Sequence, residues 1–316
     1  MKKSTKRFIT LTAAAIAGMY AYNKFVDTNA SRKNLLKTDD GDFYSWKEGN
    51  IFYTKIGEGK PILLIHDTDS RSSSEEWAKI NKKLAKHYTV YSIDLLGCGR
   101  SDKPAIKYTN YLYVQMISSF VKDVIKEKTK IVATNLSAPS VIMANNLDKE
   151  LFNKIILINP ASLRELETIP DNKSDLKNAI ISLPIIGTFI YNKLMSPLKI
   201  DYIFRKKYYS KSQLISTKTE DIYYESAHLN GSTGKYLYAS ILTKYININL
   251  SHALNNINKT IYIIGSTDLF NNLEVINQYH NSNDNFEITH ISNAALYPQL
   301  EVPEKILSII NKILDK

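Results

Sequence analysis

Histidine is the side chain that most often serves as a general base near neutral pH, and this chain contains six of them. They are His66, His87, His228, His252, His280 and His290. The only cysteine, Cys98, excludes an internal disulfide and cannot by itself hold a structural zinc ion. Any acid–base chemistry therefore depends on which elements bring one of these histidines, or a substitute for it, beside a reactive group.

Short apolar runs alternate with longer helical patterns from about Phe43 to the C-terminus, which is typical of a mostly parallel α/β sheet. We expect strands at 51–55, 61–65, 89–93, 130–134, 154–158, 260–265 and 285–291. We expect helices near 77–84, 111–128, 137–147, 270–280 and 303–314. The alternation stops after Pro160, and the following apolar residues have helical spacing. The expected domains are an N-terminal segment at 1–30, an α/β core at 31–162, a helical cap at 163–250 and the rest of the core at 251–316.

The N-terminal segment has the layout of a membrane-targeting sequence. Four basic residues, Lys2, Lys3, Lys6 and Arg7, precede an apolar stretch at 8–22. This stretch is shorter than the about 20 residues that cross a bilayer. We expect a membrane anchor, or a secretory signal if cleavage occurs at 28–30, with the folded domain outside the cytoplasm. A helix packed on the domain is the alternative.

The overall composition is that of a globular protein, with 316 residues, 44% hydrophobic and 23% charged. The 41 Lys and Arg exceed the 31 Asp and Glu, so the net charge is +10. The basic residues are scattered among acidic ones, and no nucleic-acid-binding motif accompanies them. We therefore expect no nucleic-acid partner.

Four separated segments carry a family resemblance. They are 59–66 (GKPILLIH), 91–104 (YSIDLLGCGRSDKP), 261–268 (IYIIGSTD) and 296–303 (LYPQLEVP). In order and spacing they resemble the α/β-hydrolase fold family over about residues 43–315. The resemblance implies a mostly parallel central sheet with an inserted helical cap. It also implies hydrolysis of an ester or similar acyl bond in a small or lipidic substrate, with no metal or organic cofactor.

The resemblance also implies roles for particular residues. Ser137, between the strand at 130–134 and the next helix, takes the position of the nucleophile, and Asp268 takes that of the acid which orients the base. The backbone amides of Thr68 and Ala138 would form the oxyanion hole. An alternative alignment, shifted by two residues, puts Asn135 at the nucleophile position. Ser137 would then cap the helix that follows.

Two positions depart from the family pattern. Leu296 stands where the general-base histidine is expected, and leucine cannot accept a proton. Asp67 replaces a glycine of the oxyanion loop, and Asp69 is close by. Negative charges here would destabilise an oxyanion, unless they point away from it or pair with Arg71. A relocated base at His290 or His228 would rescue catalysis. The sequence thus predicts a serine hydrolase whose activity is in question, and the alternative is a non-catalytic protein that binds a small molecule or a protein partner.

Overall fold

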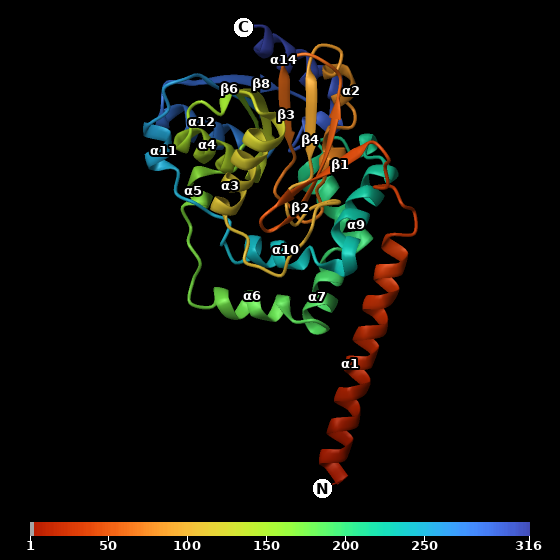
Figure 1. Ribbon diagram of the computed structural model, residues 1–316. Coiled ribbons are helices and arrows are strands. Elements are labelled where there is room, and N and C mark those ends of the chain that lie inside the picture. The colour runs from red at the N-terminus through yellow and green to blue at the C-terminus, as the bar shows by residue number, and fades with distance from the viewer. Residues whose placement is uncertain (1–2) are drawn as a thin grey trace.

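The apolar run Pro61–Ile65 forms strand β3 in the computed structural model, which describes residues 3–316. Every residue of β3 is buried, because alternate side chains point to opposite faces of the sheet and both faces are covered. Leu63 and Ile65 pack in one hydrophobic cluster, and Ile62 and Leu64 in another. The strand therefore lies in the middle of a sheet with helices on both sides (Figure 1).

The sheet has eight strands in the order β1-β2-β4-β3-β5-β6-β7-β8. Their bounds are β1 Gly41–Trp46, β2 Gly49–Ile56, β3 Pro61–Ile65, β4 Thr89–Ile93, β5 Thr129–Thr134, β6 Phe152–Ile158, β7 Ile261–Ser266 and β8 Phe286–Ile291. The β1–β2 and β2–β4 pairs are antiparallel, and the other pairs are parallel. This arrangement confirms the expected α/β fold class. Loops that follow the parallel strands meet at one edge of the sheet, the usual place for a site in such folds.

Two sets of helices cover the sheet. One face carries α3 (Asn110–Phe120), η2 (Val121–Ile125), α4 (Ala138–Leu147), α11 (Ser251–Asn255) and α12 (Asn272–Ser282). The other face carries η1 (Ser74–Trp77), α2 (Asn81–Leu84) and α14 (Pro303–Asp315). Two short helices lie at strand ends, η3 (Asn135–Ser137) after β5 and α13 (Pro298–Glu301) after β8.

The chain between β6 and β7 is helical over most of its length. Its elements before α11 are α5 (Leu163–Leu166), α6 (Ser174–Ser182), α7 (Ile186–Leu194), α8 (Pro197–Ile203), η4 (Phe204–Tyr208), η5 (Ser212–Leu214), α9 (Thr217–Ser232) and α10 (Lys235–Leu242). We call this set the cap. Phe204, Tyr208 and Tyr223 of the cap pack against Leu296 and Tyr297, so the cap rests on the loop that follows β8.

The N-terminal residues form one long helix, α1 (Lys3–Ala30). Its inner end packs against α7 and α9, where Asn23, Val26 and Ala30 are buried. Its outer end projects away from the domain (Figure 1). Among residues 3–316, no helix combines the length and apolarity needed to cross a lipid bilayer. Lys2, one of the four basic residues of this segment, lies outside the described residues.

Candidate active centre

The turn from β5 into α4 is made by Asn135, whose φ is +46°. Few residues other than glycine adopt this left-handed conformation, and asparagine is one that does. In the family that the sequence resembles, a sharp turn at this place holds the nucleophile. In the structure Asn135 takes this turn, which is the position that the alignment shifted by two residues gave it. The side chain of asparagine is a carboxamide, which is not a nucleophile.

Ser137 lies two residues beyond this turn, and its hydroxyl is engaged with the backbone. Ser137 Oγ donates to the carbonyl of Thr134 at 2.7 Å and accepts from the Thr134 amide at 3.2 Å. The side chain is buried. With no glycine to mark the turn, the sequence fits two registers. In the structure Ser137 is the third residue of η3, and its hydroxyl accepts from the backbone amide of the N-cap residue Thr134, as in a capping box. The nucleophile role of Ser137 stays a prediction.

The carboxylate of Asp67 fills the space beside the turn. Its Oδ1 accepts from the Leu136 amide at 3.0 Å, and its Oδ2 accepts from Asn135 Nδ2 at 2.9 Å and from the Tyr297 hydroxyl at 2.7 Å. The amide that follows the turn residue is the one that serves an oxyanion hole in this kind of site. Here that amide already has an acceptor, so a substrate oxygen would have to displace a buried carboxylate.

The sequence predicted the backbone amides of Thr68 and Ala138 as donors to an oxyanion. The Ala138 amide donates to the carbonyl of Asn135, so its proton is used inside the helical turn. Thr68 is fully buried beside Asp67, and its hydroxyl has no hydrogen-bond partner. The amide directly after the turn residue is that of Leu136, and the oxyanion roles of Thr68 and Ala138 stay predictions.

Three acidic side chains are buried in and around the Asp67 loop. Asp69 pairs with Arg71 at 2.5 Å, the pairing considered from the sequence. Glu76 accepts from Gln299 Nε2 at 2.7 Å, and its other oxygen accepts from the Asp67 amide at 3.3 Å. Burial, together with the charge of Asp67, raises the pKa of Glu76 to about 8, and burial together with Asp69 raises the pKa of Asp67. Such an acidic environment opposes a developing oxyanion.

Leu296, which the resemblance aligns with the general base, is buried among the aromatic residues of the cap. Its carbonyl accepts from Asn159 Nδ2 at 2.9 Å, and its amide donates to the carbonyl of Lys207 at 3.3 Å. Asn159 ends the β6 strand with a φ of +43° and also binds Ser266 and Ala295. The loop is therefore held firmly, but it carries no group that can transfer a proton at Leu296.

Asp268, the expected acid, lies against this same loop. Its Oδ1 accepts from the Asn293 amide at 3.2 Å and from the Thr267 hydroxyl at 2.8 Å, and the side chain is exposed. Asp268 therefore stands near the residues that lead to Leu296. With leucine there, it has no imidazole to orient.

The sequence predicted His228 or His290 as a substitute base, and His66 lies next to Asp67 in the chain. His66 is fully buried, donates from Nδ1 to the Asp67 carbonyl at 2.7 Å, and accepts at Nε2 from the Leu95 amide at 3.0 Å. His228 lies in α9, where Nδ1 bonds the Tyr224 carbonyl at 2.7 Å and burial lowers its pKa to about 4. His290 is an exposed residue of β8. Both hydrogen bonds of the Ser137 hydroxyl go to Thr134, so the structure brings none of these bases to it.

Sequence reasoning missed two residues of this centre, Asn159 and Tyr297. The signal for Asn159 was its place directly after a buried strand and before a proline. Tyr297 follows Leu296 in the sequence and donates to an acid 230 residues away. Among residues 3–316, no group of three His, Cys, Asp or Glu side chains is arranged to hold a metal ion.

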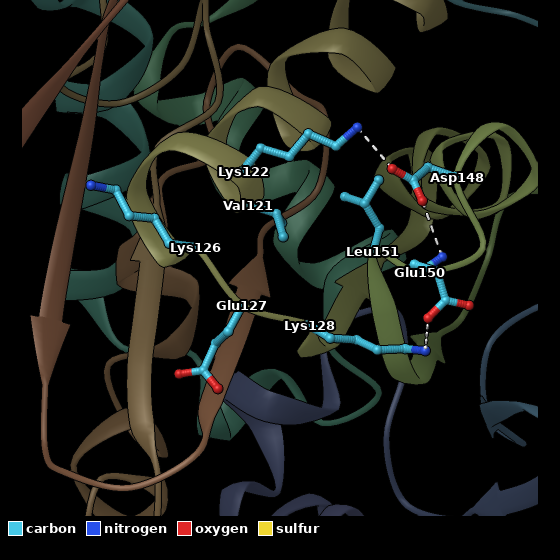
Figure 2. Close-up of a pocket in the computed structure, with 8 residues that line it drawn as sticks. All are labelled: Val121, Lys122, Lys126, Glu127, Lys128, Asp148, Glu150 and Leu151. Atoms are coloured by element: carbon cyan, nitrogen blue, oxygen red, sulfur yellow. Dashed lines mark hydrogen bonds and ion pairs between the residues drawn. The ribbon is translucent and has the colours of Figure 1, made fainter.

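One cavity of the protein adjoins this centre, and another lies far from it. One, of about 380 Å³, begins at Leu136 and extends between the core and the cap. Its walls are Leu136, Ala161, Leu166, Ile241 and Ile246, with Glu165, Thr168, Lys244 and Asn247 completing the lining. Figure 2 shows the other, of about 290 Å³, at the opposite edge of the sheet, where β5 and β6 begin. Two of its three lysines pair with neighbouring acids, Lys122 with Asp148 and Lys128 with Glu150, as on an ordinary solvated surface.

Comparison with known proteins identifies the family and the fold. A family model described as the alpha/beta hydrolase fold matches residues 57–294. A 2-hydroxy-6-oxo-6-(2'-aminophenyl)hexa-2,4-dienoic acid hydrolase from Metapseudomonas resinovorans is 32% identical over 113 residues, 35% of this chain and 39% of the relative. The matched part thus spans well under half of that relative's length.

Two solved structures share the fold. A serine hydrolase involved in carbazole degradation superposes with a TM-score of 0.71 at 18% identity, over 87% of this chain and 98% of that one. A membrane phospholipase A superposes with a TM-score of 0.66 at 16% identity, over 100% of this chain and 98% of that one. Proteins named as hydrolases therefore share this architecture, and at these identities the likeness concerns the fold. The family match covers most of the chain, and this protein belongs to the α/β-hydrolase fold family.

Proposed function

We propose that this chain is a non-catalytic member of its family and acts by binding a ligand rather than by hydrolysing one. The observation that carries the proposal is the position of the Asp67 carboxylate, which accepts hydrogen bonds from the Leu136 amide, from Asn135 and from Tyr297. The Leu136 amide, which would donate to the oxyanion of a transition state, thus already donates to Asp67.

The magnitudes favour this proposal over a weakened enzyme. Loss of the histidine in a serine-protease triad costs on the order of a million-fold in turnover. Loss of one oxyanion-hole donor costs about 10²–10³-fold. A chain with Leu296 at the base position and Asp67 on the oxyanion donor lacks both contributions, besides having an asparagine at the turn.

The cavity that begins at Leu136 supports a binding role. It lies at the edge of the sheet where α/β proteins bind their ligands, and its volume of about 380 Å³ suits a small molecule. Five of its lining residues are apolar, and Glu165, Lys244 and Asn247 provide polar groups. A small amphiphile, with an apolar body and one polar end, matches this lining.

Serine hydrolysis of an ester or similar acyl bond is the second candidate, and the names of the relatives favour it. Both a curated relative and a solved structure of this fold are named as hydrolases. In that case Ser137 would attack, Asp268 would orient a base, and small acyl compounds or lipids would be substrates. This route needs Ser137 to release its bonds to Thr134 and to gain a base.

Labelling of the full chain with a fluorophosphonate separates the two candidates, because the reagent reports an activated serine without a known substrate. We expect no label on the wild-type protein or on Ser137→Ala. We also expect label at residue 135 after the combined changes Asn135→Ser, Leu296→His and Asp67→Gly, which recreate nucleophile, base and open amide. Label on wild-type Ser137 that disappears in Ser137→Ala would overturn the non-catalytic proposal.

Binding is tested separately with 1-octanol as the probe amphiphile. Calorimetric titration should detect binding to the full chain, and Ile241→Trp, which fills the cavity from a half-exposed position, should weaken it. Leu273→Trp, at an exposed site on α12, is the matched control. Equal binding by both variants would contradict this cavity as the ligand site.

A further inference from the structure

The outer half of α1 is a helix without a protein neighbour. Each residue from 3 to 18 is exposed, and burial begins only further along, at Asn23, Val26 and Ala30. Large apolar side chains stand free on it, with Phe8 71% and Leu11 69% exposed. A single helix of this length is marginal in water, and exposed apolar groups of this extent mark an interaction site.

The outer half of α1 has a bulky apolar side and a basic side. At 100° per residue, Phe8, Ile9, Leu11 and Ile16 lie within one half of the circumference. The other half carries Lys3, Lys6 and Arg7 together with most of the alanines of the run 13–18. Two of the three threonines at 3–18 bond to the helix itself: Thr10 Oγ1 donates to the Lys6 carbonyl at 2.9 Å, and Thr12 Oγ1 donates to the Phe8 carbonyl at 3.0 Å. Their hydroxyls therefore need no partner from water.

Apolar residues of the cap lie where α1 leaves the domain. The turn between α6 and α7 is joined to α1, because Asn23 Nδ2 donates to the Ile185 carbonyl at 3.0 Å. On either side of this turn Ile180, Leu183 and Ile186 are each about 40% exposed. We call these three residues the cap tip. In Figure 1 α6 and α7 form the end of the domain beyond which α1 extends.

Charged and aromatic residues flank both apolar surfaces. Lys3, Lys6 and Arg7 are exposed at the outer end of α1, and Lys24 is exposed at the level of the cap. Lys193 of α7 stands over the Tyr22 ring at 4.1 Å. Lysines and tyrosines beside an apolar segment are typical of the interface between lipid headgroups and hydrocarbon.

We propose that the outer half of α1 and the cap tip form one docking surface for an anionic lipid bilayer, which holds the cap against the membrane. A helix with bulky apolar residues on one side and basic residues on the other matches the surface of an anionic bilayer, which takes up both kinds of side chain. The basic flanks match anionic headgroups in charge. The sequence predicted membrane contact through the N-terminal segment alone, and the cap tip is a second contact that fixes the orientation of the domain. This inference does not depend on whether the centre hydrolyses or binds.

Flotation of the full chain with vesicles tests the proposal. We expect binding to phosphatidylcholine vesicles that contain phosphatidylglycerol, and weaker binding to pure phosphatidylcholine or at high salt. The double change Leu183→Glu and Ile186→Glu should weaken binding about tenfold, as expected for the loss of two partly buried apolar side chains. Ile9→Asp with Ile16→Asp should weaken it more. The matched control, Leu147→Glu with Leu273→Glu, changes two exposed leucines of α4 and α12 and should bind as wild type.

Three outcomes would overturn the proposal. Wild-type binding by the cap-tip variant would refute the contact of the cap with lipid. Wild-type binding by the α1 variant would refute the docking surface as a whole. A chain that ignores vesicles but forms dimers, which the α1 variant disrupts, would identify a second copy as the partner of α1.

Discussion

Replacing Asp67 by alanine distinguishes a structural carboxylate from a catalytic one. The change removes the acceptor for three donors: the Leu136 amide, Asn135 Nδ2 and the Tyr297 hydroxyl. A hydrogen bond to a charged group contributes about 1.5–3 kcal/mol. The Tyr297 hydroxyl is fully buried and would lose its partner outright, whereas Leu136 and Asn135 are half-buried and would regain water.

The net effect is smaller than the sum of the three bonds. Asp67 is buried beside Asp69 and Glu76, and its removal relieves their repulsion. We count the bond from Tyr297 in full and the bonds from Leu136 and Asn135 in part, and we subtract the repulsion that is relieved. The free energy of unfolding should then fall by about 2–4 kcal/mol.

Urea denaturation of Asp67→Ala, Tyr297→Phe and the double variant provides the assay. Tyr297→Phe alone should cost about 1 kcal/mol, and the double variant should cost less than the sum because the two residues share a bond. Residues kept for catalysis commonly lower stability, so their replacement is often neutral or stabilising. An Asp67→Ala protein at least as stable as wild type would therefore refute the structural role of this carboxylate.

Three further predictions follow from single groups. Ser137→Ala should lower the free energy of unfolding by about 1 kcal/mol in urea denaturation, because the hydrogen bonds of its hydroxyl to the Thr134 backbone are lost, and should leave any esterase activity unchanged; lost activity at normal stability would contradict this structural role. Glu76, with its pKa raised from 4.5 to about 8, stabilises the fold fully below pH 4.5 and loses this contribution as the pH rises through 8. Urea midpoints should therefore fall over this range, and Glu76→Gln should flatten the fall. Because Asn23 is buried against the cap, the intact mass of the protein from its native host should include α1, and a mature mass that starts after residue 30 would disprove retention of this helix.

The buried strands could be predicted from the sequence, and the edge of the sheet could not. β3 and β4 begin and end at the expected residues, because strands covered on both faces are continuous apolar runs. β1 (Gly41–Trp46) was missed, since it lies at the edge of the sheet with most residues partly exposed and lacks such a run. The helix expected at 111–128 ends as α3 at Phe120 and continues as the single π turn η2.

The site could be predicted only in part. The position of Leu296 and the pair of Asp69 with Arg71 follow from local sequence. The sequence could not decide whether Asn135 or Ser137 occupies the turn after β5. The answer depends on which residue takes a positive φ, and asparagine can do so where no glycine marks the position. The bond from Tyr297 to Asp67 joins distant segments and has no local pattern.

The departures at this centre act as one unit. The buried carboxylate of Asp67 is compensated by donors from Asn135, Leu136 and Tyr297, and Asn135 also makes the turn after β5. With a histidine in place of Leu296, an imidazole would enter the aromatic cluster of Phe204 and Tyr208 that now closes over the loop. Replacing Asn135 or Asp67 alone would therefore leave a buried or half-buried polar group without its partner. If the chain is non-catalytic as we propose, this network stabilises the fold through the same contacts that would block hydrolysis.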